Sequence, residues 1–297
     1  MSIAEAEAAE LSLEQPSGLL RDAVERLRRN PGALVGFALI AVFVLAATFA
    51  PLIAPFGPTE RVVGLSVNPQ GPSADFWFGV DEQGRDLFSR VVYGARLSLL
   101  IGIVSVGVGL SFGMLLGAVS GYFGGWVDSV VMRVMDVMLA FPGFLLAIGI
   151  VTVLGPGLGQ IMVAIGIVNI PIFARLLRGS VLAQREADYV LAARSVGTPG
   201  MRILGAHILP NAIAPVIVQA TLAMATAIID VAGLSFVGLG PADPSLPEWG
   251  KMLADNANRL TRFHLVFFPG FAIVIGVLGL NLIGDGLREA IDPKLKT

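Results

Sequence analysis

Long apolar blocks separated by short polar stretches run through most of the chain. Four blocks cover about residues 33–53, 97–121, 214–233 and 266–283, each near the roughly 20 apolar residues that a helix needs to cross a bilayer. Another stretch, from Val137 to Ala174, carries no charge. As one helix it would be roughly 57 Å long, nearly twice the hydrocarbon thickness. Gly155-Pro156-Gly157 therefore predicts a break between a third span that starts near Val130 and a fourth that ends near Leu177.

The composition agrees with a membrane protein. Of 297 residues, 55% are hydrophobic and 14% are charged, whereas about 25% of the residues in a soluble domain are charged. Too few polar groups are present to cover the surface, so lipid must solvate much of the chain. The expected fold is an all-α integral membrane protein with six transmembrane helices. The net charge of −2 gives no indication of nucleic-acid binding.

The pattern divides the chain into three parts. Residues 1–30 are expected to form a polar cytoplasmic tail and, from Leu19, an amphipathic helix lying on the membrane surface, because leucines and arginines occupy opposite faces. Residues 31–96 hold the first span and a long extracytoplasmic segment rich in Pro and Gly. Residues 97–297 form a five-helix core that includes a loop over residues 186–211.

The basic residues predict the orientation. With six spans both termini share one side, and that side carries thirteen Lys and Arg residues against seven on the other. Basic residues accumulate in cytoplasmic loops, which predicts that both termini and the 186–211 loop are cytoplasmic. The thirteen are Arg21, Arg26, Arg28, Arg29, Arg133, Arg175, Arg178, Arg185, Arg194, Arg202, Arg288, Lys294 and Lys296; the seven are Arg61, Arg85, Arg90, Arg96, Lys251, Arg259 and Arg262.

Small residues recur every four positions in the second span. This small-xxx-small stripe lets another helix approach closely, which favours packing within the bundle over a ligand groove. Its glycines are Gly109, Gly113, Gly117 and Gly121. Pro142 and Pro171, in or near the third and fourth spans, predict kinks because each removes a backbone hydrogen bond.

A few polar residues lie within the apolar blocks. Asp136 has Arg133 one turn earlier, which predicts a structural ion pair. Asp230 has no basic neighbour in sequence, so lining of a pathway and pairing with another helix are equally good interpretations. The candidate residues of a translocation pathway are Asn169, Asp230 and Asn281.

No catalytic or metal-binding set is apparent. The chain has no cysteine, and its two histidines, His207 and His264, fall on opposite sides of the predicted membrane. No HExxH motif occurs, and the GxSxG sequence at residues 109–113 lies inside the apolar second span, where no histidine is expected at the same membrane level to activate its serine; both observations argue against an intramembrane hydrolase. The chain also lacks the G-x-x-x-x-G-K-[ST] motif of P-loop ATPases. If ATP drives this protein, the nucleotide and its Mg²⁺ must bind to another chain, and no cofactor or metal is expected on this one.

The loop between the fourth and fifth spans carries helix signals of its own. Asp188 is suited to cap a short helix through Val196, which Gly197 would end in a left-handed conformation. Thr198-Pro199 predicts the start of a second helix, which Pro210 would close. The small pair Ala192-Ala193 on the first helix would permit close approach of a partner. A cytoplasmic loop with this organisation favours a docking site.

This loop resembles the "EAA" loop in permease subunits of ABC importers. The family pattern is Glu-Ala-Ala, three residues, Gly, nine residues, then Ile-x-Leu-Pro. The matching residues are Ala192, Ala193, Gly197, Leu209 and Pro210, whereas Leu191 replaces the Glu and His207 replaces the Ile. The loss of Glu removes any salt bridge that this residue would make.

Further motifs resemble the "C"-type permease of dipeptide, oligopeptide and nickel importers, over about residues 28–293. Val80 stands where the family usually has Thr, and Asp230 where it usually has Glu. The matching segments are Arg28-Arg29-Asn30-Pro31, residues 79–86, Tyr93-Gly94-Ala95-Arg96, residues 121–128, residues 234–240 and residues 284–293.

The resemblance implies a type I ABC importer fold in a bacterial or archaeal plasma membrane. It further implies four partners: a second, related permease, two ATPase subunits that the loop contacts through a coupling helix, and an extracytoplasmic substrate-binding protein. Peptides, nickel chelates and other small solutes are all compatible substrates. The competing hypothesis, an ion-coupled secondary transporter using Asp230, would require several intramembrane charges, and the apolar blocks do not contain them.

Overall fold

The computed structural model describes residues 19–64, 71–241, 243–257 and 262–291. The predicted tail before Leu19, together with Lys294 and Lys296, lies outside this part of the chain.

Five helices within the described residues have the length and apolarity of membrane spans, and a bent pair of helices makes a possible sixth. The five are α3 (Pro31–Thr48), α5 (Leu87–Phe123), α8 (Leu158–Arg185), α12 (Ala214–Leu234), which a π-helical turn extends to Leu239, and α14 (Phe263–Ile291). The bent pair is α6 (Gly125–Leu139) and α7 (Gly143–Leu154). The shorter helices are α2 (Leu19–Arg29), α4 (Ala50–Ile53), α9 (Asp188–Ser195), α10 (Gly200–Arg202), α11 (Leu209–Ala212) and α13 (Trp249–Asn256).

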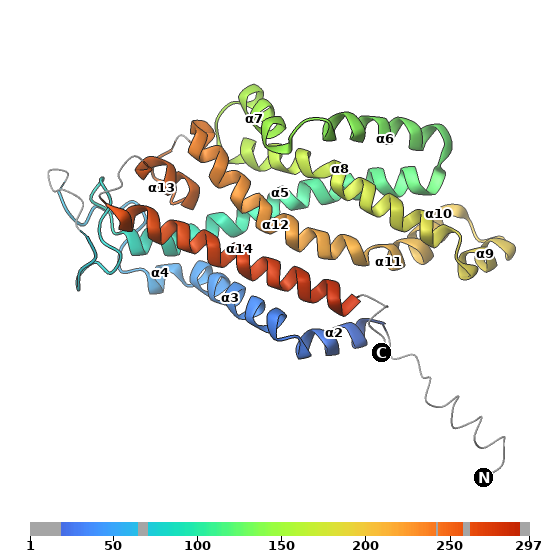
Figure 1. Ribbon diagram of the computed structural model, residues 1–297, viewed down its shortest axis with the longest axis horizontal. Helices are drawn as coiled ribbons and strands as arrows, with labels where there is room; N and C mark the ends of the chain where they lie inside the picture. The colour runs from blue at the N-terminus through green and yellow to red at the C-terminus, as the bar shows by residue number, and fades with distance from the viewer. Residues whose placement is uncertain (1–18, 65–70, 242, 258–261, 292–297) are drawn as a thin grey trace, which may run out of the picture.

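The long helices run side by side and give the molecule two distinct ends (Figure 1). One end carries α9 and α10, which form the loop between α8 and α12. The opposite end carries α13 and the segment that leads into α5. We call these the loop end and the outer end. At 37 residues, α5 is far longer than the predicted 97–121 span, because its first turns belong to the outer end.

The contact between α5 and α8 is built on glycine. Gly109, Gly113, Gly117 and Gly121 all face α8 and are buried. A Cβ atom on Gly113 would lie 2.5 Å from Cβ of Phe173, and one on Gly109 would lie 2.8 Å from Cβ of Asn169. The two backbones therefore approach within a distance that larger residues would prevent.

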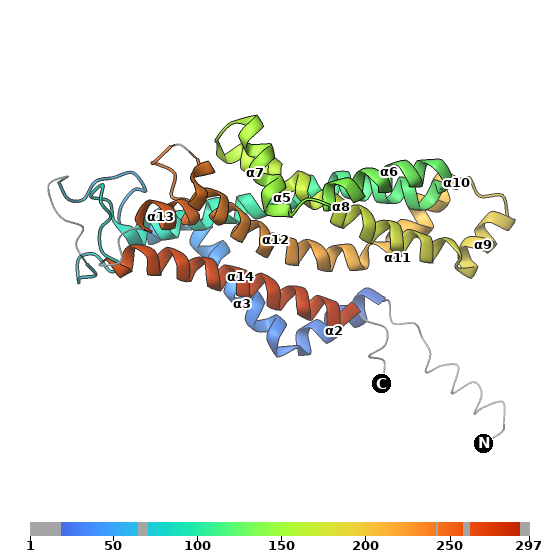
Figure 2. The same cartoon turned by 45° about the horizontal axis from the view of Figure 1, so that its top comes forward.

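The third span differs from the single helix that was predicted. The helices α6 and α7 meet at an angle of 93° around Pro142, so that α7 projects away from the line of α6 (Figure 2), while Ala147 and Val151 keep one face of α7 buried in the main apolar cluster. Pro142 lacks an N–H and its ring excludes a continuous helix, so the expected kink is a complete break. In contrast, α8 continues through Pro171 without ending.

Two ion pairs tie α6 to α8. Arg178 donates from Nε and Nη2 to the two carboxylate oxygens of Asp128, at 2.5 and 2.6 Å. Arg175 pairs with Asp136. The predicted pair between Asp136 and Arg133 is therefore wrong: the neighbouring helix supplies the partner, and Arg133 is exposed.

At the outer end, α13 packs against three of the long helices, α5, α12 and α14. Trp249 is 1% exposed and donates from its indole N–H to the carbonyl of Val91 in α5, at 3.0 Å. A Cβ atom on Gly94 would clash with this ring, and one on Gly250 would clash with Ala232 in α12. The indole also packs in a cluster with residues of α14.

Glu248 precedes α13 and is almost completely buried. Its carboxylate accepts hydrogen bonds from the backbone N–H groups of Gly250 (2.7 Å) and Lys251 (2.6 Å) and from the hydroxyl of Ser235 (3.0 Å). Burial raises the pKa of Glu248, and these hydrogen bonds oppose the increase only in part. The contact with Ser235 joins the start of α13 to the end of α12.

We expect Gly117→Val to destabilise the bundle by about 1–3 kcal/mol, because the new side chain would push α8 away from α5 at Ala174. Gly107→Val is the matched control, since it lies on the same helix with no atom within 4 Å of a new Cβ. Thermal unfolding of the purified protein in detergent compares the two. Equal unfolding temperatures would contradict the importance of this contact.

We expect Glu248 to make stability depend on pH in a direction opposite to that of a paired surface acid. Its folded-state pKa lies above the value of about 4.3 in the unfolded chain. The associated stability is therefore fully present below about pH 4.3 and is lost as the pH rises through the folded-state pKa.

Unfolding temperatures of the wild type and Glu248→Gln, measured from acidic to neutral pH, isolate this effect. The unfolding temperature of the variant should increase relative to that of the wild type as the pH rises. A difference that stays constant over the range would show that the carboxyl has the same pKa in both states.

Candidate functional site

The loop at one end of the bundle begins with α9, whose faces differ sharply. Val190 is fully buried and Ala193 nearly so, and both belong to the same apolar cluster as Leu177 and Val181 of α8. Leu191 and Ala192 lie on the opposite face and are exposed. Only Ala192 of the small pair Ala192-Ala193 is therefore available to a partner, and Ala193 packs against the chain itself.

Gly197 ends α9 in the predicted left-handed conformation, with φ of +76°. The N–H of Thr198 donates to the carbonyl of Ala193 (3.1 Å), and the N–H of Gly197 donates to that of Arg194 (3.0 Å). This pair of bonds is the Schellman motif that closes many helices at a glycine. The turn is therefore fixed by hydrogen bonds within the loop.

The helix starts in the loop were predicted one residue away from their observed positions. Asp188 is the first residue of α9 and makes no capping bond; the residue before it, Ala187, takes the extended cap conformation. Likewise α10 starts at Gly200, with Pro199 as its cap residue in place of Thr198.

Pro210 does not close the second helix as predicted. A π-helical turn over Ile203–Ile208 follows α10, and Pro210 lies in the first turn of α11, where no backbone N–H is required. His207 lies in the π-helical turn; its Nδ1 is buried and has no hydrogen-bond partner among the described residues. Leu209 is half-buried beside it.

Buried residues anchor the second half of the loop. Ile203, Leu204 and Ile208 extend into the main apolar cluster. Gly200 lies against the hydroxyl of Tyr122 at the end of α5, and Arg185 donates to the carbonyl of Tyr122 at 3.1 Å. The loop is therefore held against α5 and α8 and does not extend freely from them.

Above these anchors the loop presents an exposed surface that is mainly apolar and includes two arginines, and the exposed carboxylate of Asp188 lies next to it in α9. Val196 is 81% exposed and Met201 is 67% exposed. We call this set the loop surface; its members are Tyr189, Leu191, Ala192, Arg194, Val196, Met201 and Arg202. Sequence reasoning missed Val196 and Met201, although apolar residues beside a helix-ending glycine are a signal for a contact surface.

The three polar candidates for a pathway lie on different helices. Asn169 is buried in the contact between α5 and α8, where its side-chain N–H donates to the carbonyl of Ile165 at 2.9 Å. Asn281 on α14 and Asp230 on α12 are half-buried. Within the described residues no hydrogen bond or ion pair reaches Asp230. The structure does not join the three into one site, and the location of Asn169 suits packing better than a pathway.

Comparison with protein families gives two matches. The family described as "Binding-protein-dependent transport system inner membrane component" matches residues 113–297. A second description, "N-terminal TM domain of oligopeptide transport permease C", matches residues 18–72.

Several relatives align over nearly the whole chain. A dipeptide transport system permease protein of Alkalihalophilus pseudofirmus is 50% identical over 93% of this chain and 90% of its own length. A di/tripeptide transport system permease protein of Pseudomonas aeruginosa is 45% identical over 98% and 97%. A glutathione transport system permease protein of Escherichia coli is 44% identical over 91% and 89%.

A solved structure shares the fold. It is an inward-facing conformation of the MetNI methionine ABC transporter, with a TM-score of 0.56 and 21% sequence identity. The match covers 68% of this chain and 96% of that one.

Proposed function

The chain belongs to the family of binding-protein-dependent transport system inner membrane components, and on that premise we propose that the loop surface couples its membrane helices to ATPase subunits. The protein is a membrane-embedded permease of an ABC importer. The single observation that carries the coupling role is the loop itself. It exposes a mainly apolar surface that includes two arginines, while its other face is part of the main core, so a force on the surface reaches α5, α8 and α12.

The energy source is assigned to other chains. The sequence has no P-loop, so ATP and Mg²⁺ are expected on two ATPase subunits, and this subunit is expected to catalyse no reaction. A second, related permease would complete the pathway, and an extracytoplasmic binding protein would deliver the substrate. The loop end and both termini would then face the cytoplasm of the cell, in agreement with the distribution of basic residues.

Peptides are the proposed substrate class. The three relatives are named for dipeptides, for di- and tripeptides and for glutathione, itself a small peptide. This agreement favours peptides over nickel or another small solute. Family membership likewise favours ATP-driven transport over an ion-coupled carrier that relies on Asp230.

The replacement of the usual Glu by Leu191 fits a surface that binds mainly through apolar contact. Leu191 is 44% exposed and lies on the same face as Ala192. A partner that buries Leu191 gains from the removal of apolar area from water. A salt bridge at this position is not part of the proposed contact.

We expect Ala192→Trp to leave membrane insertion and folding unchanged while lowering peptide uptake and ATPase binding by about tenfold, the scale of a disrupted contact at the centre of an interface. The substituted side chain is exposed, so the fold can accommodate it. The measurement is uptake and ATP hydrolysis in proteoliposomes that contain the complete transporter.

Ala140→Trp is the matched control, because Ala140 is also exposed but lies in the bend between α6 and α7, outside the loop. It should support normal uptake. Full uptake and ATPase binding by Ala192→Trp would overturn the coupling role of the loop surface.

A further inference from the structure

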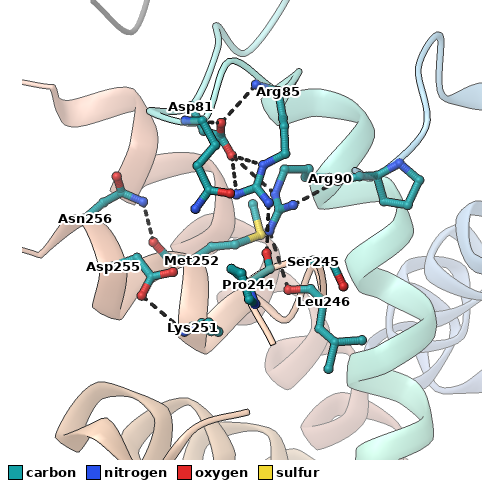
Figure 3. Close-up of polar contacts among 12 residues, drawn as sticks. Asp81, Arg85, Arg90, Pro244, Ser245, Leu246, Lys251, Met252, Asp255 and Asn256 are labelled. Carbon is teal, nitrogen blue, oxygen red and sulfur yellow. Dashed lines mark hydrogen bonds and ion pairs between the residues drawn. The ribbon is translucent and has the colours of Figure 1, made fainter. Parts of the chain in front are cut away.

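The outer end contains a polar cavity of about 340 Å³ between the start of α5 and α13 (Figure 3). Three cationic side chains line it: Arg85, Arg90 and Lys251. The carboxylates at its wall include Asp81 and Asp255, and Glu82 is a further lining residue with a contact of its own. The cavity lies far from the loop surface, at the opposite end of the bundle.

Asp81 has no remaining capacity for a ligand. One of its oxygens accepts the backbone N–H groups of Gln83 and Arg85, each at 2.9 Å. The other accepts Nε of Arg85 at 2.7 Å, lies 2.7 Å from Nη2 of the same side chain, and lies 3.5 Å from Nε of Arg90. One buried carboxylate is thus shared between two buried guanidinium groups.

The cations retain hydrogen-bond donors. An arginine side chain has five N–H donors. Arg90 donates one hydrogen bond to the carbonyl of Pro58 (2.9 Å) and one to that of Leu246 (3.5 Å). Arg85, besides its contacts with Asp81, donates one to the carbonyl of Pro244 (2.8 Å). Lys251, which has three donors, makes one long contact of 3.4 Å with Asp255. The cavity wall therefore offers N–H groups that these bonds do not occupy.

Burial makes this surplus of donors costly. The side chains of Arg85 and Arg90 are 8% and 4% exposed, and a buried donor without an acceptor loses its hydration without compensation. An anionic oxygen in the cavity would supply the acceptor. A singly charged group fits better than a phosphate dianion, because the carboxylates of Asp81, Glu82 and Asp255 also line the cavity.

We infer that this cavity is a carboxylate-binding site, in which Lys251 and the two arginines donate to the carboxylate and Asp255 lowers its affinity. The inference concerns a different end of the molecule from the proposed coupling surface and does not depend on it. Two sources of the carboxylate follow from the proposed function: the C-terminus of a peptide, or an Asp or Glu side chain of the binding protein.

Lysine acylation of the purified complex provides the test, because the chain has only three lysines: Lys251, Lys294 and Lys296. Mass spectrometry would follow the rate at each lysine, with the last two as internal references. N-acetylglycylglycine should slow acylation of Lys251 by about twofold to fivefold, the range expected from one partly exposed ion pair. The C-terminal amide of the same compound, which lacks the carboxylate, should have no effect.

Asp255→Asn should increase this protection, since it removes a competing negative charge and its side chain is half exposed. Asp243→Asn is the matched control: it removes the same charge from an exposed residue that does not line the cavity, and should leave the protection unchanged. If the charged residues of the cavity have only a structural role, neither variant should show increased protection of Lys251.

A second arm uses the purified binding protein in place of the small compound. Protection by the binding protein alone would assign the carboxylate to one of its side chains, whereas protection by N-acetylglycylglycine would assign it to the peptide. Equal effects of the acid and its amide, or no protection by either ligand, would overturn the carboxylate site. Neither result bears on uptake by Ala192→Trp, so the two proposals fail independently.

Discussion

The close contact between α5 and α8 is the constraint on which the rest of the structure depends. In a membrane, apolar side chains gain little by leaving lipid for another helix, so association relies on shape. The glycine stripe of α5 supplies that shape and lets Phe173 and Ala174 of α8 approach its backbone directly. The main apolar cluster then extends from this contact to α12 and to the buried residues of the loop.

Polar interactions are concentrated at the two ends of this apolar framework. At the loop end, Asp128 and Asp136 join α6 to α8. At the outer end, Glu248 joins α13 to α12 through Ser235, and Arg85 joins the start of α5 to the segment before α13. The ends are thus connected by specific bonds, while the middle is held by packing. This division suits a protein whose ends meet other molecules and whose middle meets lipid.

The features that could be predicted from sequence are those encoded by local spacing. Apolar blocks of span length, the four-residue glycine repeat and the left-handed glycine at Gly197 each follow from neighbours along the chain. The partner of Asp136 could not be predicted, because Arg133 is close in sequence whereas Arg175 is close only after α6 packs on α8. The cavity at the outer end was missed for the same reason: residues 81–90 and 244–256 come together only in the folded chain.

The π-helical turn at Ile203–Ile208 has a mechanical consequence. It links α10 to α11, which is followed at once by α12, so nearly every residue from Gly200 to Leu239 is helical. A continuous helical segment is stiff, so a displacement at one of its ends is transmitted to the other. Rotation of a few degrees at the loop would therefore reappear as rotation of α12, and with it the half-buried carboxylate of Asp230 would turn relative to its surroundings.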